Sequence, residues 1–109
     1  MSAGTALRAD AAAADELARR IEAEARSLPD LLDGVAARIG HDVWRGPAAD
    51  EFTTGLRRWQ GRLDAEAGSL LAVARRLRLR ADSLRQEATR ADAAEAVERD
   101  LARTAHGIG

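Results

Sequence analysis

Four residue types are missing from this 109-residue chain: cysteine, lysine, tyrosine and asparagine. Without cysteine there is no disulfide framework, no thiolate nucleophile and no cysteine-ligated metal, and the chain suits an oxidising or a reducing location equally. All seventeen basic residues are arginine, against eighteen acidic residues, so the formal net charge is only −1. A balance this close to zero excludes a global electrostatic attraction to nucleic acid or to membranes.

Aromatic residues and long apolar runs are scarce as well. The only aromatic side chains of the Phe, Trp and Tyr types are Trp44, Phe52 and Trp59. A core would therefore consist mainly of alanine and leucine and would be narrow, as between two packed helices. No apolar stretch approaches the ~20 residues that a helix needs to span a bilayer. Residues 1–15 lack a basic segment followed by an apolar core, so we expect no conventional secretory signal.

Apolar residues recur every three or four positions from Leu7 to Ile39, which is the spacing of one face of an amphipathic helix. Early members of this series are mostly alanine and later ones are larger, so packing should thicken toward the middle of the chain. We expect Pro29 to kink this helix, because proline removes a backbone donor and clashes with the preceding turn. Ser27 would then cap the restarted segment. The candidate core residues of this helix are Leu28, Leu32, Val35 and Ile39.

Residues 40–47 are expected to be the turn between two helices. Gly46 can take backbone angles that residues with a β-carbon avoid, and Trp44 offers a large apolar face to close the open end of a hairpin. Pro47 suits the first turn of the next helix, where its missing N–H costs nothing. Asp50 follows in that first turn, which favours negative charge.

A second apolar series with helical spacing predicts a helix from Ala48 to about Ala91. Because acidic residues take the next heptad positions, we expect residues 92–109 to form a polar helical extension that frays from Thr104. The hairpin would then comprise residues 1–91. Spacing alone leaves open whether the second series contacts the first helix or a second chain. Its candidate core residues are Phe52, Leu56, Trp59, Leu63, Leu70, Leu77 and Leu84.

These two helices predict an all-α fold, an antiparallel helix–turn–helix hairpin. Two helices alone cannot enclose a core, so one apolar side should stay open and need a partner chain. We therefore expect the hairpin to pair with itself or with a paralogue into a four-helix bundle.

The segment from Val43 to Phe52 resembles the WXG family, the small helical-hairpin substrates of the type VII (ESX) secretion system. In that family a Trp-x-Gly motif stands between two helices, and here Trp44 and Gly46 occupy those places. Small residues follow the glycine, and the aromatic Phe52 stands six residues after it, as in the family pattern.

The resemblance covers roughly Leu7 to Ala91. It implies a dimer of antiparallel hairpins that form a four-helix bundle and are exported folded, often as pairs, and some members are effectors or export partners of larger toxins. The partners would be a paralogous WXG-like chain or a toxin, together with the secretion machinery. The chain would be cytoplasmic before export and then secreted or held at the cell surface.

One departure from the family concerns its export signal, a Tyr-x-x-x-Asp/Glu motif just after the second helix. In the nearest frames the acidic residue is kept as Asp92 or Glu95, but Ala88 or Ala91 stands in place of the tyrosine. Since one partner of a family heterodimer can carry the signal for both, we expect this chain to be the signal-less partner, or an export chaperone for a toxin.

Two other functions are compatible with the same hairpin. Four arginines between Arg75 and Arg80 could neutralise phosphate in a cytosolic coiled-coil adaptor that binds nucleic acid. On a helix these arginines fan out around the sides with no exposed aromatic residue between them, which favours a solvated, partly ion-paired surface. Leu79 falls opposite the seam and is either exposed or a second contact point. The other alternative is a neutraliser of a cognate toxin, which differs only in its partner.

Signals for catalysis and for metal binding are lacking. His41 and His106 are the only histidines, and neither has acidic or histidine neighbours at metal-ligand spacing. The carboxylates are mixed with arginine on polar helix faces, and the serines lack the context of a nucleophile. A thin hairpin also has no pocket for a substrate. We expect no enzymatic activity and no cofactor.

Overall fold

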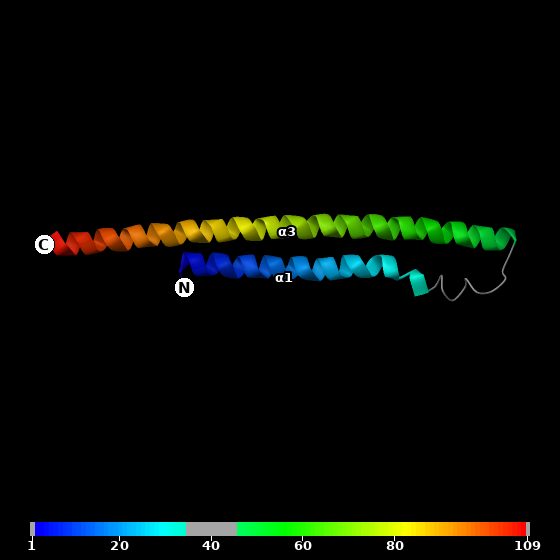
Figure 1. The fold of residues 1–109 in the computed structure, drawn as a ribbon, viewed down its shortest axis with the longest axis horizontal. Coiled ribbons are helices and arrows are strands. Elements are labelled where there is room, and N and C mark those ends of the chain that lie inside the picture. Colours follow the sequence, from blue (N-terminus) through cyan, green and yellow to red (C-terminus); the bar gives the residue numbers. More distant parts are fainter. Residues whose placement is uncertain (1, 35–45, 109) are drawn as a thin grey trace. The chain divides into compact units, whose positions relative to one another are not determined.

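The structure, a computed structural model, describes residues 2–34 and 46–108, and within them it has helices and no strands. Helix α1 spans Ala3–Asp30 (28 residues) and helix α3 spans Pro47–Ile108 (62 residues) (Figure 1). Two helices without strands confirm the all-α class and are consistent with a helical hairpin. The turn residues between them, with Val35, Ile39, His41 and Trp44, lie outside the described residues.

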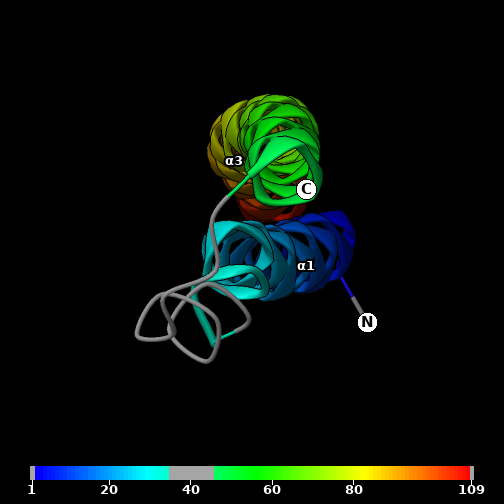
Figure 2. The ribbon, with the colours of Figure 1, turned by 90° about the vertical axis from the view of Figure 1, so that its right-hand side faces the viewer.

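The chain divides into two compact units, and each contains a stretch of both helices. The terminal unit comprises residues 1–17 and 76–109, and the central unit comprises residues 18–75. In the terminal unit the start of α1, drawn in blue, lies alongside the yellow-to-orange stretch of α3, and α1 and α3 are also adjacent in the turned view (Figures 1 and 2).

Helix α1 begins four residues earlier than the apolar series indicated, at Ala3 instead of Leu7. Ser2 provides the reason, because its hydroxyl accepts a hydrogen bond from the Thr5 backbone N–H at 3.1 Å. Its carbonyl also accepts a hydrogen bond from the Ala6 N–H at 3.1 Å, which opens the helical ladder. Ser2 is thus an N-cap, and apolar spacing alone gives no sign of a cap in front of small residues.

Helix α1 ends at Asp30, one residue after Pro29, and residues 33–34 are helical again, whereas Val35 to Ile39 lie outside the described residues. The Leu31 N–H donates to the Leu28 carbonyl at 3.2 Å, a tighter turn than an α-helix makes. Ser27 caps no restarted segment, since its hydroxyl donates back to the Glu24 carbonyl at 2.8 Å. The helix therefore ends one residue after Pro29, which has no backbone N–H to donate.

Helix α3 begins at Pro47, as the fixed φ of proline predicts for a first helical position. Gly46 precedes it with φ of +112°, a conformation that glycine adopts readily and other residues rarely do. The Gly46 carbonyl accepts a hydrogen bond from the Asp50 N–H at 3.1 Å, so it starts the helical ladder. Asp50 stands in the first turn as predicted.

The far end of α3 is helical up to Ile108, so the polar extension continues the helix. In this last part of the helix the Thr104 hydroxyl donates to the Asp100 carbonyl at 2.9 Å. Residues 93–103 are rich in alanine, arginine and glutamate, which are strong helix formers, and they carry the helix past the end of the apolar series.

Alanine fills most of the buried positions in both units. All but Ala49 belong to the two apolar series, so the predicted helix faces are the buried ones. No large side chain among the described residues is fully buried. The buried hydrophobic residues are Ala11, Ala18, Ala25, Ala49, Ala67, Ala74, Ala81, Leu84 and Ala88.

Candidate interaction surface

The contact between the two helices of the terminal unit is narrow. Ala11 and Ala81 are 0% exposed and pack with Leu84, which is 7% exposed. Leu7 and Ala14 border this cluster and are partly buried. Small side chains at the centre let two helices approach closely, but they bury little apolar area.

Ion pairs between the helices fix their register in the terminal unit. Arg8 of α1 donates to Asp92 of α3 at 2.6 Å. Asp15 of α1 accepts from Arg85 and also lies 3.8 Å from Arg78, both on α3. From Arg8 to Asp15 the residue number on α1 rises, whereas the partner's number on α3 falls from Asp92 to Arg85. The two stretches therefore run antiparallel.

Asp15 also affects the electrostatics of its partner. Its hydrogen bond to Arg85 raises the pKa of that guanidinium, and the charges of Asp15 and Asp82 act in the same direction. Arg85 bridges the two helices through Asp15. It also lies 3.2 Å from Asp82, a partner on its own helix, α3.

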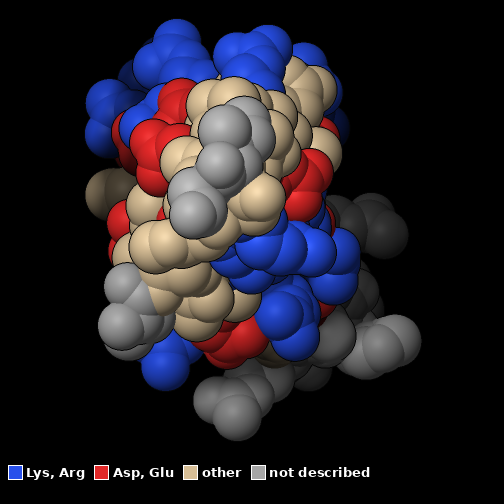
Figure 3. Space-filling model, turned by 90° about the vertical axis from the view of Figure 1, so that its left-hand side faces the viewer, with Lys and Arg blue, Asp and Glu red and all other residues tan. Residues whose placement is uncertain are grey.

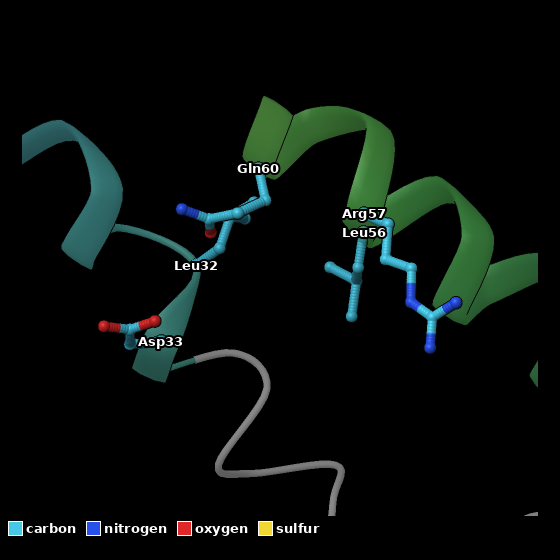
Figure 4. Close-up of a pocket in the computed structure, with 5 residues that line it drawn as sticks. All are labelled: Leu32, Asp33, Leu56, Arg57 and Gln60. Carbon is cyan, nitrogen blue, oxygen red and sulfur yellow. The ribbon is translucent and has the colours of Figure 1, made fainter. Parts of the chain in front are cut away.

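In the central unit residues 32–33, just after the end of α1, and the first part of α3 border a shallow hollow of about 140 Å³. Leu32 and Leu56 point into it from opposite sides, and Gln60 lies across its top (Figure 4). Asp33 and Arg57 complete its lining at the edges. The hollow is mainly aliphatic and contains no convergent set of polar groups, so it suits an apolar side chain and no polar small molecule.

Trp59 is the candidate core residue that the single chain leaves most exposed among those the structure describes. At helical spacing it lies on the same side of α3 as Leu56 and Leu63, yet it is 56% exposed. The Arg62 guanidinium lies over its ring, 5.3 Å from the centroid, which is a cation–π distance. Trp59 is therefore not part of the hairpin core in the single chain.

The remaining candidate core residues in the described part of the chain are covered to different degrees. Leu84 is buried, and those that are half-buried are Leu28, Leu32, Phe52, Leu56, Leu63, Leu70 and Leu77. Large apolar side chains that are 42–65% exposed include Leu17, Leu31, Trp59, Leu71, Val73, Leu79, Val97 and Leu101. The helices thus leave much of their bulky apolar surface in solvent.

The degenerate export-signal region is engaged within the chain. Ala88, which stands where the signal would have its tyrosine, is completely buried. Asp92 is held by Arg8, and Glu95 is half-buried. Asp92, the acidic residue of the frame that begins at Ala88, therefore joins α3 to α1.

The arginine-rich stretch of α3 is partly ion-paired. Arg78 lies near Asp15 and Arg80 lies 3.6 Å from Glu87. These pairs take up part of the positive charge that a phosphate backbone would need. Leu79, between the two arginines, is 61% exposed.

Within residues 2–34 and 46–108, no group of three or more potential ligands could hold a metal ion. His106 is exposed near the end of α3, and His41 is outside this part of the chain. Neither helix in the same part has an apolar stretch that would cross a membrane. No family model, curated protein or solved structure matches the chain.

Proposed function

We propose that this protein is a WXG-like helical hairpin that acts by binding a second helical hairpin, as a type VII secretion substrate or the export partner of one. The observation that carries this proposal is the contrast between the buried and the exposed apolar residues. Eight of the nine buried hydrophobic residues are alanine, whereas the large apolar side chains of the described residues other than Leu84 stay partly in solvent. A second hairpin would bury those side chains and complete a four-helix bundle.

Trp59 supports the same proposal. An aromatic side chain that is 56% exposed, on the apolar side of a helix, contributes strongly to binding when a partner covers it. The aliphatic hollow between Leu32 and Leu56 lies within one to two turns of it on α3. An apolar residue of the partner would fill this hollow.

We assign to the chain the role of the signal-less partner. It has no tyrosine, Ala88 is buried where that tyrosine would stand, and Asp92 is bound to Arg8. The partner, a paralogous hairpin or a toxin, would then carry the export signal for both chains. The complex would assemble in the cytoplasm and leave the cell by type VII secretion.

A size measurement tests the pairing. Sedimentation of the pure protein, alone and co-expressed with the product of the neighbouring reading frame, should give a dimer or a one-to-one complex of helical chains. A stable, well-ordered monomer under both conditions would contradict the proposal.

Export is tested separately. The chain should be detected in culture filtrate, and it should disappear from the filtrate when type VII export is blocked or when its partner is deleted. Salt-sensitive binding to DNA by the purified protein, without export, would favour the nucleic-acid adaptor instead.

A further inference from the structure

Two arginines lie beside the exposed Trp59 on α3 in the central unit. At about 100° per residue, Arg62 and Arg58 are about 60° and 100° around the helix from the indole, in the direction away from Leu63. All three side chains are exposed, and the Arg62 guanidinium lies over the ring at 5.3 Å from its centroid. We call Arg58, Trp59 and Arg62 the Trp59 patch.

Acidic residues border the Trp59 patch along the same face of α3. Glu51 precedes the patch and Glu66 follows it, and with the two arginines they fall within an arc of about 80°. Within residues 2–34 and 46–108, none of these four exposed residues belongs to an ion pair. Glu66 follows Arg62 at a spacing that favours such a pair, yet the guanidinium lies over the indole. The face therefore presents its charges to solvent in the order negative, positive, positive, negative.

Net charge cannot direct a partner to this chain. Its seventeen basic residues nearly balance eighteen acidic ones. In the view toward the C-terminal end of α3, blue and red side chains lie next to one another (Figure 3). A local pattern of charge beside an apolar surface can still select a partner, because charges that flank paired helices set which helices pair and in which orientation.

We propose that the Trp59 patch binds an acidic stretch on an amphipathic helix of the partner, an inference that rests on the proposed pairing of hairpins. An apolar side chain of that helix would cover the indole, and carboxylates on its edge would bind Arg58 and Arg62. The acidic stretch would be confined to about two turns, because Glu51 and Glu66 repel carboxylates at their own levels. Basic residues of the partner at these two levels would complete the match.

Two other occupants fit the Trp59 patch less well. A nucleic acid could stack on the indole and bind the arginines, but its phosphate charge continues along the strand and would meet Glu51 and Glu66. A second copy of the chain aligned on Trp59 would bring the two pairs of arginines together. The charge pattern therefore favours a helix of a different, acidic sequence.

Fluorescence of Trp59 tests the proposal with two synthetic amphipathic helices. The helices share one leucine stripe and differ only in carrying glutamate or lysine along its edge. In a Trp44→Phe background Trp59 is the only indole, so a blue shift of the emission reports that the ring leaves water. The glutamate helix should cause this shift and bind about tenfold more tightly than the lysine helix at low salt. Calorimetry on the unmodified chain should give the same ratio of affinities.

Charge reversal shows whether the two arginines set this preference. Arg58→Glu combined with Arg62→Glu should reverse it, so that the lysine helix binds more tightly. The matched control is Arg57→Glu, at an exposed arginine about 160° around the helix from Trp59, which should keep the preference for the glutamate helix. Helicity by circular dichroism should be unchanged in these variants, because the altered side chains are exposed.

Four outcomes would overturn the proposal. Equal binding of the two helices would mean that the leucine stripe alone is recognised, and binding of neither would mean that the patch takes no helix. An unchanged preference after the double reversal would place the recognised charges elsewhere on the chain. Tighter binding of a single-stranded oligonucleotide than of the glutamate helix would make nucleic acid the occupant.

Failure of this inference differs from failure of the proposed function. A complex with the product of the neighbouring reading frame that survives the double reversal would overturn the role of the Trp59 patch and leave the pairing of hairpins standing. Absence of any complex would overturn the pairing, and the preference between the two synthetic helices would then decide the chemistry of the patch by itself.

Discussion

Gly4 of α1 lies directly against the Asp92 carboxylate of α3, and the same carboxylate binds Arg8 at 2.6 Å. A β-carbon at position 4 would collide with Asp92 Oδ1. Glycine thus allows the first turn of α1 to approach α3 closely. Together with the contacts of Asp15, this approach fixes the position of α1 along α3 in the terminal unit.

The first prediction compares two glycines inside helices. Gly68→Ala should raise the free energy of unfolding by about 0.5–1 kcal/mol, because alanine is the better helix former and nothing lies within 4 Å of the added carbon. Gly4→Ala should gain clearly less or lose stability, since Asp92 must move away from Arg8. Urea denaturation of the two variants provides the measurement. Equal gains would show that the close approach at Gly4 has no energetic role.

The second prediction concerns Gly46. Gly46→Ala should lower the free energy of unfolding by about 1–2 kcal/mol, because φ of +112° is strained for a residue with a β-carbon. No atom lies within 4 Å of the added carbon, so crowding does not contribute. Thermal unfolding beside Gly68→Ala separates this backbone effect from helix propensity. An unchanged midpoint for Gly46→Ala would contradict the assigned conformation.

The third prediction compares two acidic partners of Arg85. Asp15 reaches it from the other helix, and its side chain is 24% exposed, whereas Asp82 lies on the same helix and its side chain is 67% exposed. Asp15→Asn should lower the melting temperature more than Asp82→Asn, because of these two carboxylates only Asp15 joins α1 to α3. The difference should shrink in high salt, since screening weakens exposed ion pairs. Equal melting temperatures of the two variants would mean that the Asp15–Arg85 pair between the helices stabilises the protein no more than the Asp82–Arg85 pair within α3.

The sequence predicted which side of each helix is buried but not the register between them. Apolar residues that recur every three or four positions identify one face of each helix, because helical geometry is periodic. Sliding one helix along the other keeps the same faces together, so spacing cannot select one offset. The pairing of Arg8 with Asp92 selects it, and in a chain with many arginines and carboxylates no pair stands out from the sequence.

Helix ends were the other limit. Pro29 was expected to kink a helix that runs to Ile39; α1 ends one residue after it, and residues 33–34 are helical again. Ser2 caps the start of α1 although no bulky apolar residue follows it. Trp44 lies outside the described part and no comparison matches the chain, so the family resemblance stays a prediction.

The fourth prediction tests the alanine seam. Ala81→Leu should lower the free energy of unfolding by about 1–3 kcal/mol, because Ala81 is completely buried beside Ala11 and a larger side chain would push the helices apart. Ala72→Leu, at an exposed position, should change it by no more than about 0.5 kcal/mol. Denaturant unfolding of both variants gives the comparison. A tolerated leucine at 81 would show that the seam is loosely packed.

The last prediction addresses the partner. Trp59 is 56% exposed on the apolar side of α3, so Trp59→Ala should leave the helicity of the chain unchanged. If the second hairpin covers this ring, the same change should weaken the complex by about 2 kcal/mol or more, which is roughly a thirtyfold loss of affinity. Leu71→Ala is the matched control, because Leu71 is 43% exposed and lies about 120° around the helix from Trp59. Sedimentation equilibrium measures both. Equal effects of the two variants would place the partner somewhere other than the apolar side of α3, whereas a selective loss with Trp59→Ala would locate it there.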